Sequence, residues 1–189
     1  MNKFMLGLVS TFVCVAALHA ADKKTDNAAA FEKDVIRLLS TYGAETYSEK
    51  QAYGGGIESM YLGFGKAGNP VVGVALRDTK TYKQVMAIVA VTPDEAGFKI
   101  AAAEIPDVEK FGGKSKSLTK DALKDITGRI FLNSTNARGL VDAVTGATKY
   151  YKAVYVSYAL MSSKVIEELT TPPDWPKKPL PPQATPANP

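Results

Sequence analysis

The stretch IESMYLGFGKAGNPVVGVALRDTKTYKQVMAIVAVTPDEAGFKIAAAE, residues 57–104, decides the fold. Its apolar segments are short and rich in β-branched and aromatic residues, and turn-forming Gly, Pro, Asn and Asp separate them. This pattern is typical of short strands joined by tight turns, which favours a mainly antiparallel sheet. The expected strands are Ile57–Phe64, Val71–Leu76, Gln84–Val91 and Phe98–Glu104.

A helix is expected ahead of the sheet, at Ala28–Tyr42, with Gly43 as its stop. Between this helix and the first expected strand, the run Tyr53–Gly56 contains three consecutive glycines. We interpret this run as a turn rather than a phosphate-binding loop, because a lone glycine run is a weak signal for phosphate. The apolar residues of the helix recur at spacings of three and four and build one stripe: Phe31, Val35, Leu38, Leu39 and Tyr42.

Two further helices are expected after the sheet. Residues 105–117 are polar and irregular, and a helix at Lys120–Leu132 follows, with Thr119 as its N-cap. A polar loop at Asn133–Gly139 precedes a long amphipathic helix at about Gly146–Leu169. The predicted fold class is therefore α+β: a mainly antiparallel sheet flanked by helices, with a long C-terminal helix. The apolar stripe of that helix is Ala147, Tyr151, Val154, Tyr158, Met161, Val165 and Leu169.

Three segments of different composition follow one another along the chain. Residues 1–20 are typical of a signal peptide, because a lysine precedes a short apolar run, Phe4–Leu18, that ends in small residues. Residues 21–169 form the expected domain, and residues 170–189, with eight prolines, are expected to be an extended or disordered tail. The sequence thus predicts export to the periplasm or cell envelope, with a retained membrane anchor as the alternative.

Cleavage of the signal peptide removes Cys14 and His19, the one cysteine and the one histidine of the chain. A mature chain without them excludes disulfides, thiolate nucleophiles, zinc sites built from His or Cys, and Ser–His or Cys–His catalytic pairs. A Ser–Lys or carboxylate enzyme is still allowed, although nothing points to one. The 22 basic and 19 acidic residues that remain are scattered, which disfavours nucleic-acid binding. The favoured classes are a binding module and the carrier of an organic cofactor.

The segment Asp142–Thr148, DAVTGAT, stands at the start of the last expected helix. A helix that begins at about Gly146 presents free backbone N–H groups and the positive end of its dipole, and both favour a phosphate group. Thr148 lies in that first turn, and the small Gly146 and Ala147 let a bulky group reach the backbone. The alternative is an ordinary N-cap, since Asp, Ser and Thr are common at helix starts for hydrogen-bonding reasons alone.

The same segment resembles the attachment motif of the FMN-binding domain family, Asp-x-x-(Ser/Thr)-Gly-Ala-(Ser/Thr). The resemblance implies that Thr148 is joined to the phosphate of FMN by a phosphoester bond, with Thr145, Gly146 and Ala147 beside it. It also implies that Asp142 belongs to what the attaching enzyme recognises. No metal site is implied.

A looser resemblance extends over residues 57–169. Glu104–Pro106 and Phe111–Lys114 occur in the order typical of the family, whereas Asp107–Glu109 lacks the glycines that the family has there. The chain is similar to the small periplasmic relatives of the flavin-carrying subunits of the sodium-pumping NADH:quinone reductase and the Rnf complex. Those subunits keep an N-terminal membrane helix, which this chain is expected to lose.

The resemblance implies an exported electron-transfer flavoprotein with covalent FMN, more an electron carrier than a stand-alone enzyme. FMN accepts electrons in pairs and releases them singly, while the protein orients and tunes the flavin. The implied partners are a flavin transferase that depends on FAD and Mg, and redox donor and acceptor proteins, which could be membrane-bound. The alternatives are an exported non-redox binding or regulatory module with the motif unmodified, and a flavin-dependent reductase of a small substrate.

Several side chains near the motif are candidates for contact with the flavin. Lys149 could stabilise the phosphate or a reduced flavin, or it could simply be a solvated lysine. Glu104 could approach the ring from the strand side, a role that rests on the partial family match alone. Four tyrosines could stack on the ring, although tyrosines at helical spacing are more often core or surface residues: Tyr150, Tyr151, Tyr155 and Tyr158.

Overall fold

A computed structural model describes residues 30–79, 85–141 and 149–182. The chain divides into two compact units, Met1–Asp34 and Val35–Pro189. The described part of the first unit is residues 30–34, which include the start of helix α2 (Glu32–Thr41). The described part of the second unit carries the rest of α2, the sheet and the other helices.

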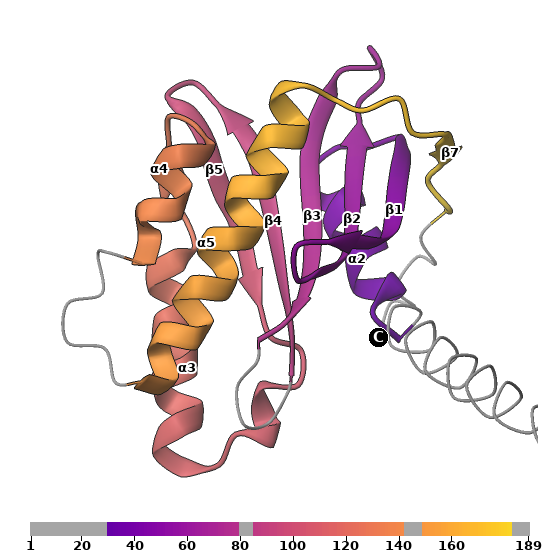
Figure 1. Ribbon diagram of the computed structural model, residues 1–189. Coiled ribbons are helices and arrows are strands. Elements are labelled where there is room, and N and C mark those ends of the chain that lie inside the picture. Colours follow the sequence, from indigo (N-terminus) through magenta and orange to yellow (C-terminus); the bar gives the residue numbers. More distant parts are fainter. Residues whose placement is uncertain (1–29, 80–84, 142–148, 183–189) are drawn as a thin grey trace, which may run out of the picture. The chain divides into compact units, whose positions relative to one another are not determined.

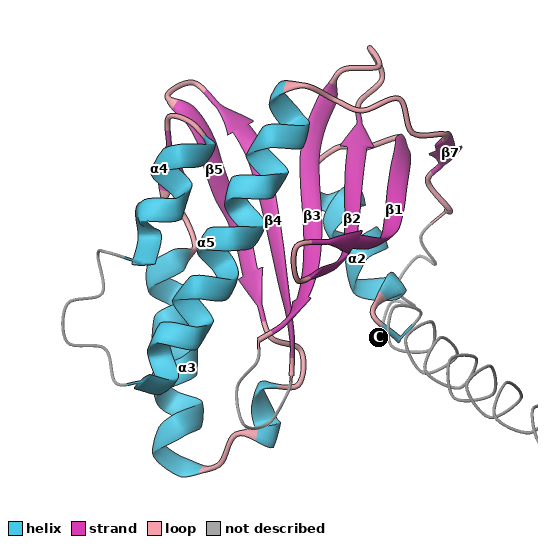
Figure 2. Ribbon diagram, viewed as in Figure 1, coloured by secondary structure: helices cyan, strands magenta, loops and turns pink. Residues whose placement is uncertain are grey.

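The second unit is built on a seven-stranded sheet with the strand order β6-β5-β4-β3-β2-β1-β7 (Figures 1 and 2). Every neighbouring pair is antiparallel, which confirms the predicted α+β class. From β1 to β6 each strand pairs with the next in sequence, so the sheet is a meander. The strands are β1 (Thr46–Gly54), β2 (Ile57–Phe64), β3 (Pro70–Asp78), β4 (Met86–Asp94), β5 (Gly97–Glu104), β6 (Ile130–Phe131) and β7 (Lys177–Pro179).

The four predicted strands are confirmed as β2 to β5, and β2 has the predicted bounds. Gln84 lies outside the described residues. The predicted break after Val91 is wrong: β4 runs on to Asp94, and Pro93 pairs with Phe98 beside the turn. A proline is tolerated there because the strand is about to end. Strand β1 was not predicted, because its buried Ser48 is polar and residues 50–52 are all exposed, so that no apolar alternation marks it.

Helices cover both faces of the sheet (Figure 1). Helix α2 lies on one face, and α5 (Lys149–Thr170) crosses the other, where α3 (Gly113–Ile126) and α4 (Ser134–Arg138) pack beside it. A β-carbon added at Gly63 would meet Leu39 of α2, whereas one added at Gly73 would meet Val165 of α5. The two glycines thus mark the close approaches of the two helices.

Helix α2 ends as predicted at Gly43, whose φ of 80° is left-handed. The N–H of Gly43 donates to the carbonyl of Ser40, and the N–H of Ala44 donates to that of Leu39. These two bonds form a Schellman cap, which satisfies carbonyls that the end of a helix would leave free. The predicted apolar stripe is confirmed at the buried Val35, Leu38 and Leu39.

The region between the sheet and α5 differs from the prediction. Helix α3 starts at Gly113 rather than Lys120, so Thr119 is not an N-cap: it is buried inside the helix, and its hydroxyl donates to the Ser115 carbonyl. Ile130, expected on this helix, belongs to β6 because the helix ends at Ile126.

The expected loop at Asn133–Gly139 contains α4 instead. The Asn133 side chain accepts a hydrogen bond from the Asn136 N–H and caps the helix, and the helix buries Ala137. A single buried residue in five gives too weak a periodic pattern for the helix to be predicted from the sequence.

The predicted C-terminal helix is confirmed as α5, which buries Val154, Tyr158, Met161, Val165 and Leu169. Its predicted start at Gly146 lies outside the described residues. In the described part of the tail, residues 177–179 are extended and form β7, which pairs with β1. No helix among the described residues is long and apolar enough to span a membrane.

The close approach at Gly73 predicts a cost for any side chain there. A β-carbon in Gly73→Ala would lie well inside van der Waals contact of Val165 Cγ1, and a β-branched valine has little freedom to move away. We expect the free energy of unfolding in urea to fall by about 1–3 kcal/mol. The matched control is Gly139→Ala, where φ is −66° and nothing lies within 4 Å of the added carbon. Equal stability of the two variants would contradict this packing.

Candidate functional site

The segment Asp142–Thr148, which is predicted to attach a flavin, lies outside the described residues. Helix α5 is described from Lys149, the residue that follows Thr148 in the chain. Of the other predicted site residues, Glu104 is described at the end of β5, and Lys149 is described as the first residue of α5. The surroundings that the structure does describe are the start of α5 and the residues that hold it.

The charge of the start of α5 suits a bound phosphate. The first turn of this helix contains no acidic residue, and Lys152 is exposed on it. The first N–H groups of a helix have no partner within the helix, and its dipole adds positive potential at the same end. A phosphoester monoanion on the preceding residue would therefore meet favourable charges and no carboxylate of that turn.

Tyr155 ties the first half of α5 to the end of α3. Its hydroxyl donates to Asp125 Oδ2 at 2.7 Å, and Arg129 Nη2 donates to the same oxygen at 2.6 Å. Burial and the hydrogen bond to the Asp125 carboxylate raise the pKa of Tyr155 to about 12. Tyr155 is 8% exposed, so its ring is a core residue rather than a surface for stacking.

Tyr158 ties the same part of α5 to the sheet. Its hydroxyl donates to the backbone carbonyl of Glu104 at 2.7 Å, and the side chain is fully buried. Burial, and secondly the charge of Glu104, raise the pKa of Tyr158 well above its ordinary value. Of the four tyrosines considered for ring stacking, the two whose side chains are described are thus hydrogen-bonded parts of the core.

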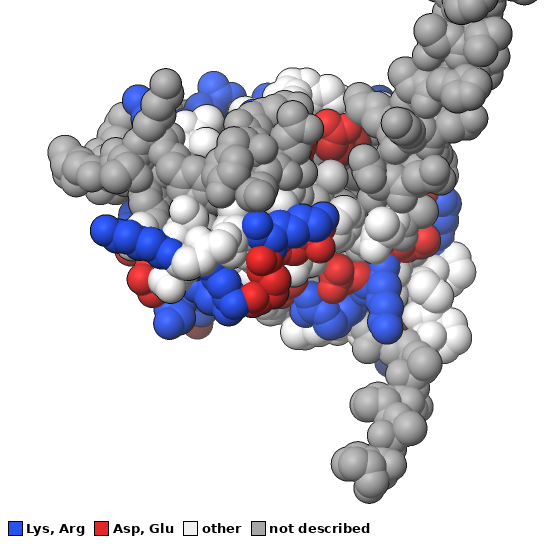
Figure 3. Space-filling view, turned by 90° about the horizontal axis from the view of Figure 1, so that it is seen from below, with Lys and Arg blue, Asp and Glu red and all other residues white. Residues whose placement is uncertain are grey.

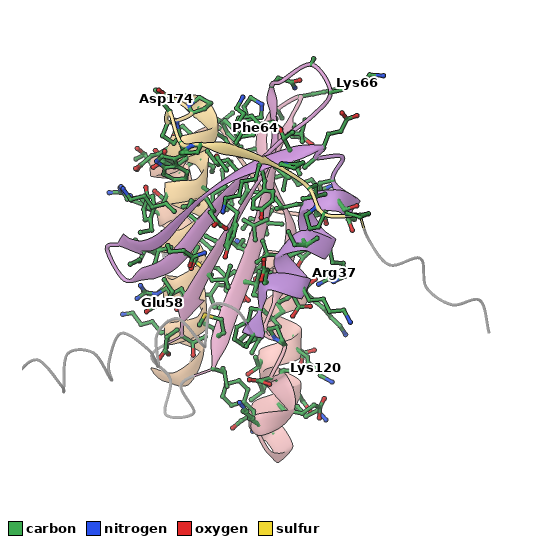
Figure 4. The ribbon with its side chains drawn as sticks, turned by 90° about the vertical axis from the view of Figure 1, so that its right-hand side faces the viewer. Arg37, Glu58, Phe64, Lys66, Lys120 and Asp174 are labelled. Atoms are coloured by element: carbon green, nitrogen blue, oxygen red, sulfur yellow. The ribbon has the colours of Figure 1, made fainter. Side chains whose placement is uncertain are left out.

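The side chain of Glu104 is engaged on the other face of the sheet. Arg37 of α2 donates to Glu104 Oε2 at 2.6 Å, and this ion pair is partly exposed (Figure 4 labels Arg37). Since α5 covers the opposite face, the Glu104 carboxylate and the start of α5 are not brought together. The backbone carbonyl of Glu104, by contrast, does reach α5 through Tyr158.

Sequence reasoning missed the side-chain partners of Tyr155 and of Glu104. Asp125 lies at the end of α3 and Arg129 lies beyond it, so their i, i+4 ion pair forms across the end of the helix. Arg37 could not be paired with Glu104 from the sequence, because 67 residues separate them.

The described surface carries mixed charge. On the face seen in Figure 3, Lys and Arg side chains lie interspersed with Asp and Glu side chains. Glu109, for example, pairs with both Lys116 and Lys120. Within the described ranges, no group of three or more His, Cys, Asp or Glu side chains is arranged to hold a metal ion.

Comparisons of the chain with models of protein families, with curated proteins and with solved structures find no match.

The hydrogen bond of Tyr155 gives a pH-dependent prediction. Tyr155→Phe keeps the ring and removes the donor, while Asp125 keeps Arg129, so we expect a loss of about 1 kcal/mol in the free energy of unfolding at neutral pH. The pKa of Tyr155 rises from 10.0 in the unfolded chain to about 12 in the folded protein. The contribution of its hydroxyl is therefore complete below pH 10 and is lost as pH rises towards 12.

The measurement is urea unfolding of the wild type and the Tyr155→Phe variant at a series of pH values. The difference between their stabilities should narrow over the alkaline range, and both proteins share every other titrating group. A difference that stays constant across that range would show that the Tyr155 hydroxyl does not titrate as its contacts require.

Proposed function

We propose that this protein is an exported electron-transfer flavoprotein that carries FMN on Thr148 through a phosphoester bond. The observation that carries the proposal is the segment Asp142–Thr148, with its Asp, two Thr and Gly-Ala at the attachment spacing, placed directly before helix α5. A Gly-Ala-Thr tripeptide alone would not indicate flavin attachment. The complete motif, followed directly by a long helix in a strand-rich domain, does indicate it.

Two features of the described residues support the proposal. The first turn of α5 has no carboxylate that would repel a phosphate, and it carries Lys152. The hydroxyls of Tyr155 and Tyr158 fix this half of the helix to α3 and to β5. A cofactor attached at its start would therefore be held by a part of the fold with little freedom to move.

The roles of the chain's residues follow from this arrangement. Thr148 would supply the hydroxyl oxygen that takes the flavin phosphate from FAD, with AMP as the leaving group. Thr145, Gly146 and Ala147 would line the attachment point, and Asp142 would be read by the transferase. Bound FMN would supply the exchange between two-electron and one-electron partners.

The proposal also names partners and a location. Maturation requires a flavin transferase that uses FAD and Mg, and function requires a redox donor and an acceptor. Export to the periplasm or cell envelope, proposed from residues 1–20, gives a reason for the covalent bond, because a dissociable FMN would diffuse away there.

The test is the intact mass of the denatured protein after export in a host that contains the flavin transferase. We expect one added FMN phosphoester on the wild type and none on Thr148→Ala. Thr148→Ser is the matched control, because it keeps a hydroxyl at the same position and should keep the modification.

An unmodified wild-type mass, in a host whose transferase modifies another substrate, would overturn the proposal. The protein would then be assigned to the alternative class, an exported non-redox binding or regulatory module with the motif unmodified. Modification of Thr148→Ala would show that the attachment residue lies elsewhere.

A further inference from the structure

The C-terminal tail returns to the sheet after α5 and pairs with β1, so that β7 is the outermost strand at this edge. Residues 171–176 connect Thr170 to β7, which pairs antiparallel with β1 at Thr46, Tyr47 and Ser48. Beyond β7, the N–H of Leu180 donates to the carbonyl of Glu45 at 2.9 Å. Figure 4 looks onto this edge and shows the tail running from Asp174 across the sheet past Phe64.

Two adjacent lysines of β7 contact opposite faces of the sheet. Lys177 is paired with Ser48, and its Nζ lies 3.9 Å from the centroid of the Phe64 ring. Lys178 is paired with Tyr47, and its Nζ lies 2.6 Å from Glu49 Oε1. Because successive side chains of a strand point to opposite faces, the β1 edge contacts a dibasic segment on both sides at once.

An aromatic contact precedes the lysines. The ring of Trp175 meets that of Tyr53 edge-on, with 6.2 Å between the centroids. The Tyr53 hydroxyl in turn donates to Glu168 near the end of α5. The tail is therefore held by an aromatic edge, a cation over a ring, an ion pair and backbone hydrogen bonds.

Each of these contacts is weak because it is at least partly exposed to solvent. All three residues of β7 are exposed, and the ion pair joins side chains that are 51% and 24% exposed. A favourable exposed ion pair and a short edge ladder contribute little on their own, whereas a like-charge pair in the same place adds repulsion to a ladder that is already marginal. The tail stays in place mainly because its connection to α5 holds it at a high local concentration.

We infer that the outer edge of β1 is a strand-docking surface that the protein's own tail occupies, and that an extended dibasic segment of another polypeptide occupies it when the tail leaves. The occupant is expected to be dibasic because the edge offers a partner for a lysine on each face. These partners are the Glu49 carboxylate on one face and the Phe64 ring on the other. Without the tail, β1 would be an edge strand with open backbone groups, which is the usual site for such added strands. The inference does not depend on the flavin.

The test uses full-length variants that free the tail in two ways. Lys178→Glu places a carboxylate beside Glu49 and leaves the surface intact, whereas Glu49→Lys frees the tail and reverses the charge of the surface. The protein has one tryptophan, so the emission of Trp175 reports whether the tail is docked. We expect a red shift in each single variant and the wild-type emission in the double variant Glu49→Lys/Lys178→Glu.

The probe is a fluorescein-labelled peptide with the sequence of residues 174–182, DWPKKPLPP, followed by polarisation up to millimolar concentration. It should bind the Lys178→Glu protein roughly tenfold more tightly than the Glu49→Lys protein, because the ion pair is replaced by a like-charge contact. A peptide with Glu in place of the second lysine should show the opposite preference. The wild type and the double variant should bind either peptide weakly, since their own tails compete.

Two results would overturn the inference. One is Trp175 emission that stays unchanged in the single variants, which would mean that the charged contact does not hold the tail. The other is peptide binding that is absent, or equal for the two freed proteins, which would mean that the β1 edge is not a dibasic docking surface. Both results are independent of whether Thr148 carries a flavin.

Discussion

The packing of α5 across the sheet is the interaction on which the rest of the structure depends. The apolar stripe of this helix covers β3 and β4, where Gly73 leaves room for Val165 to reach the backbone. Helices α3 and α4 pack against α5 as well as against the strands β5 and β6. Hydrogen bonds of Tyr155 and Tyr158 hold the first half of α5, and the tail leaves from its other end. A shift of α5 would therefore disturb the core, the tyrosine hydrogen bonds and the tail together.

This dependence also explains which elements the sequence could predict. The strands β2 to β4 bury nearly continuous apolar runs and helix α5 buries a periodic apolar stripe, so that their own patterns specify them. The elements β1, β7 and α4 lack such a pattern: nearly half of β1 is exposed, β7 is wholly exposed, and α4 buries a single residue. Lys177 and Lys178, for example, look like tail residues until the pairing with Ser48 and Tyr47 is known. Similarly, the start of α3 was misplaced because a glycine, Gly112, occupies the N-cap and gives no side-chain signal.

The candidate site likewise has one part that could be predicted from the sequence and one part that could not. The motif at Asp142–Thr148 is local and could be recognised from the sequence alone, and it still carries the proposal of a covalent flavin. The roles of its neighbours depend on long-range contacts that no local pattern reveals. Tyr155 and Tyr158 were candidates for stacking, but their hydroxyls bind Asp125 and the Glu104 carbonyl, so their described role is to hold α5 in place.

The length of α5 has a consequence for how the protein could meet two partners. Its 22 residues span about 33 Å at 1.5 Å per residue. The proposed attachment residue directly precedes one end of this rod, and the connection to β7 leaves from the other. A redox partner would bind near the start of α5, and a docked strand would bind beyond its end. The distance between them would exceed the width of a small peptide or a flavin. Under the two proposals above, a strand docked at the β1 edge would not occupy the start of α5, where the proposed flavin would be attached.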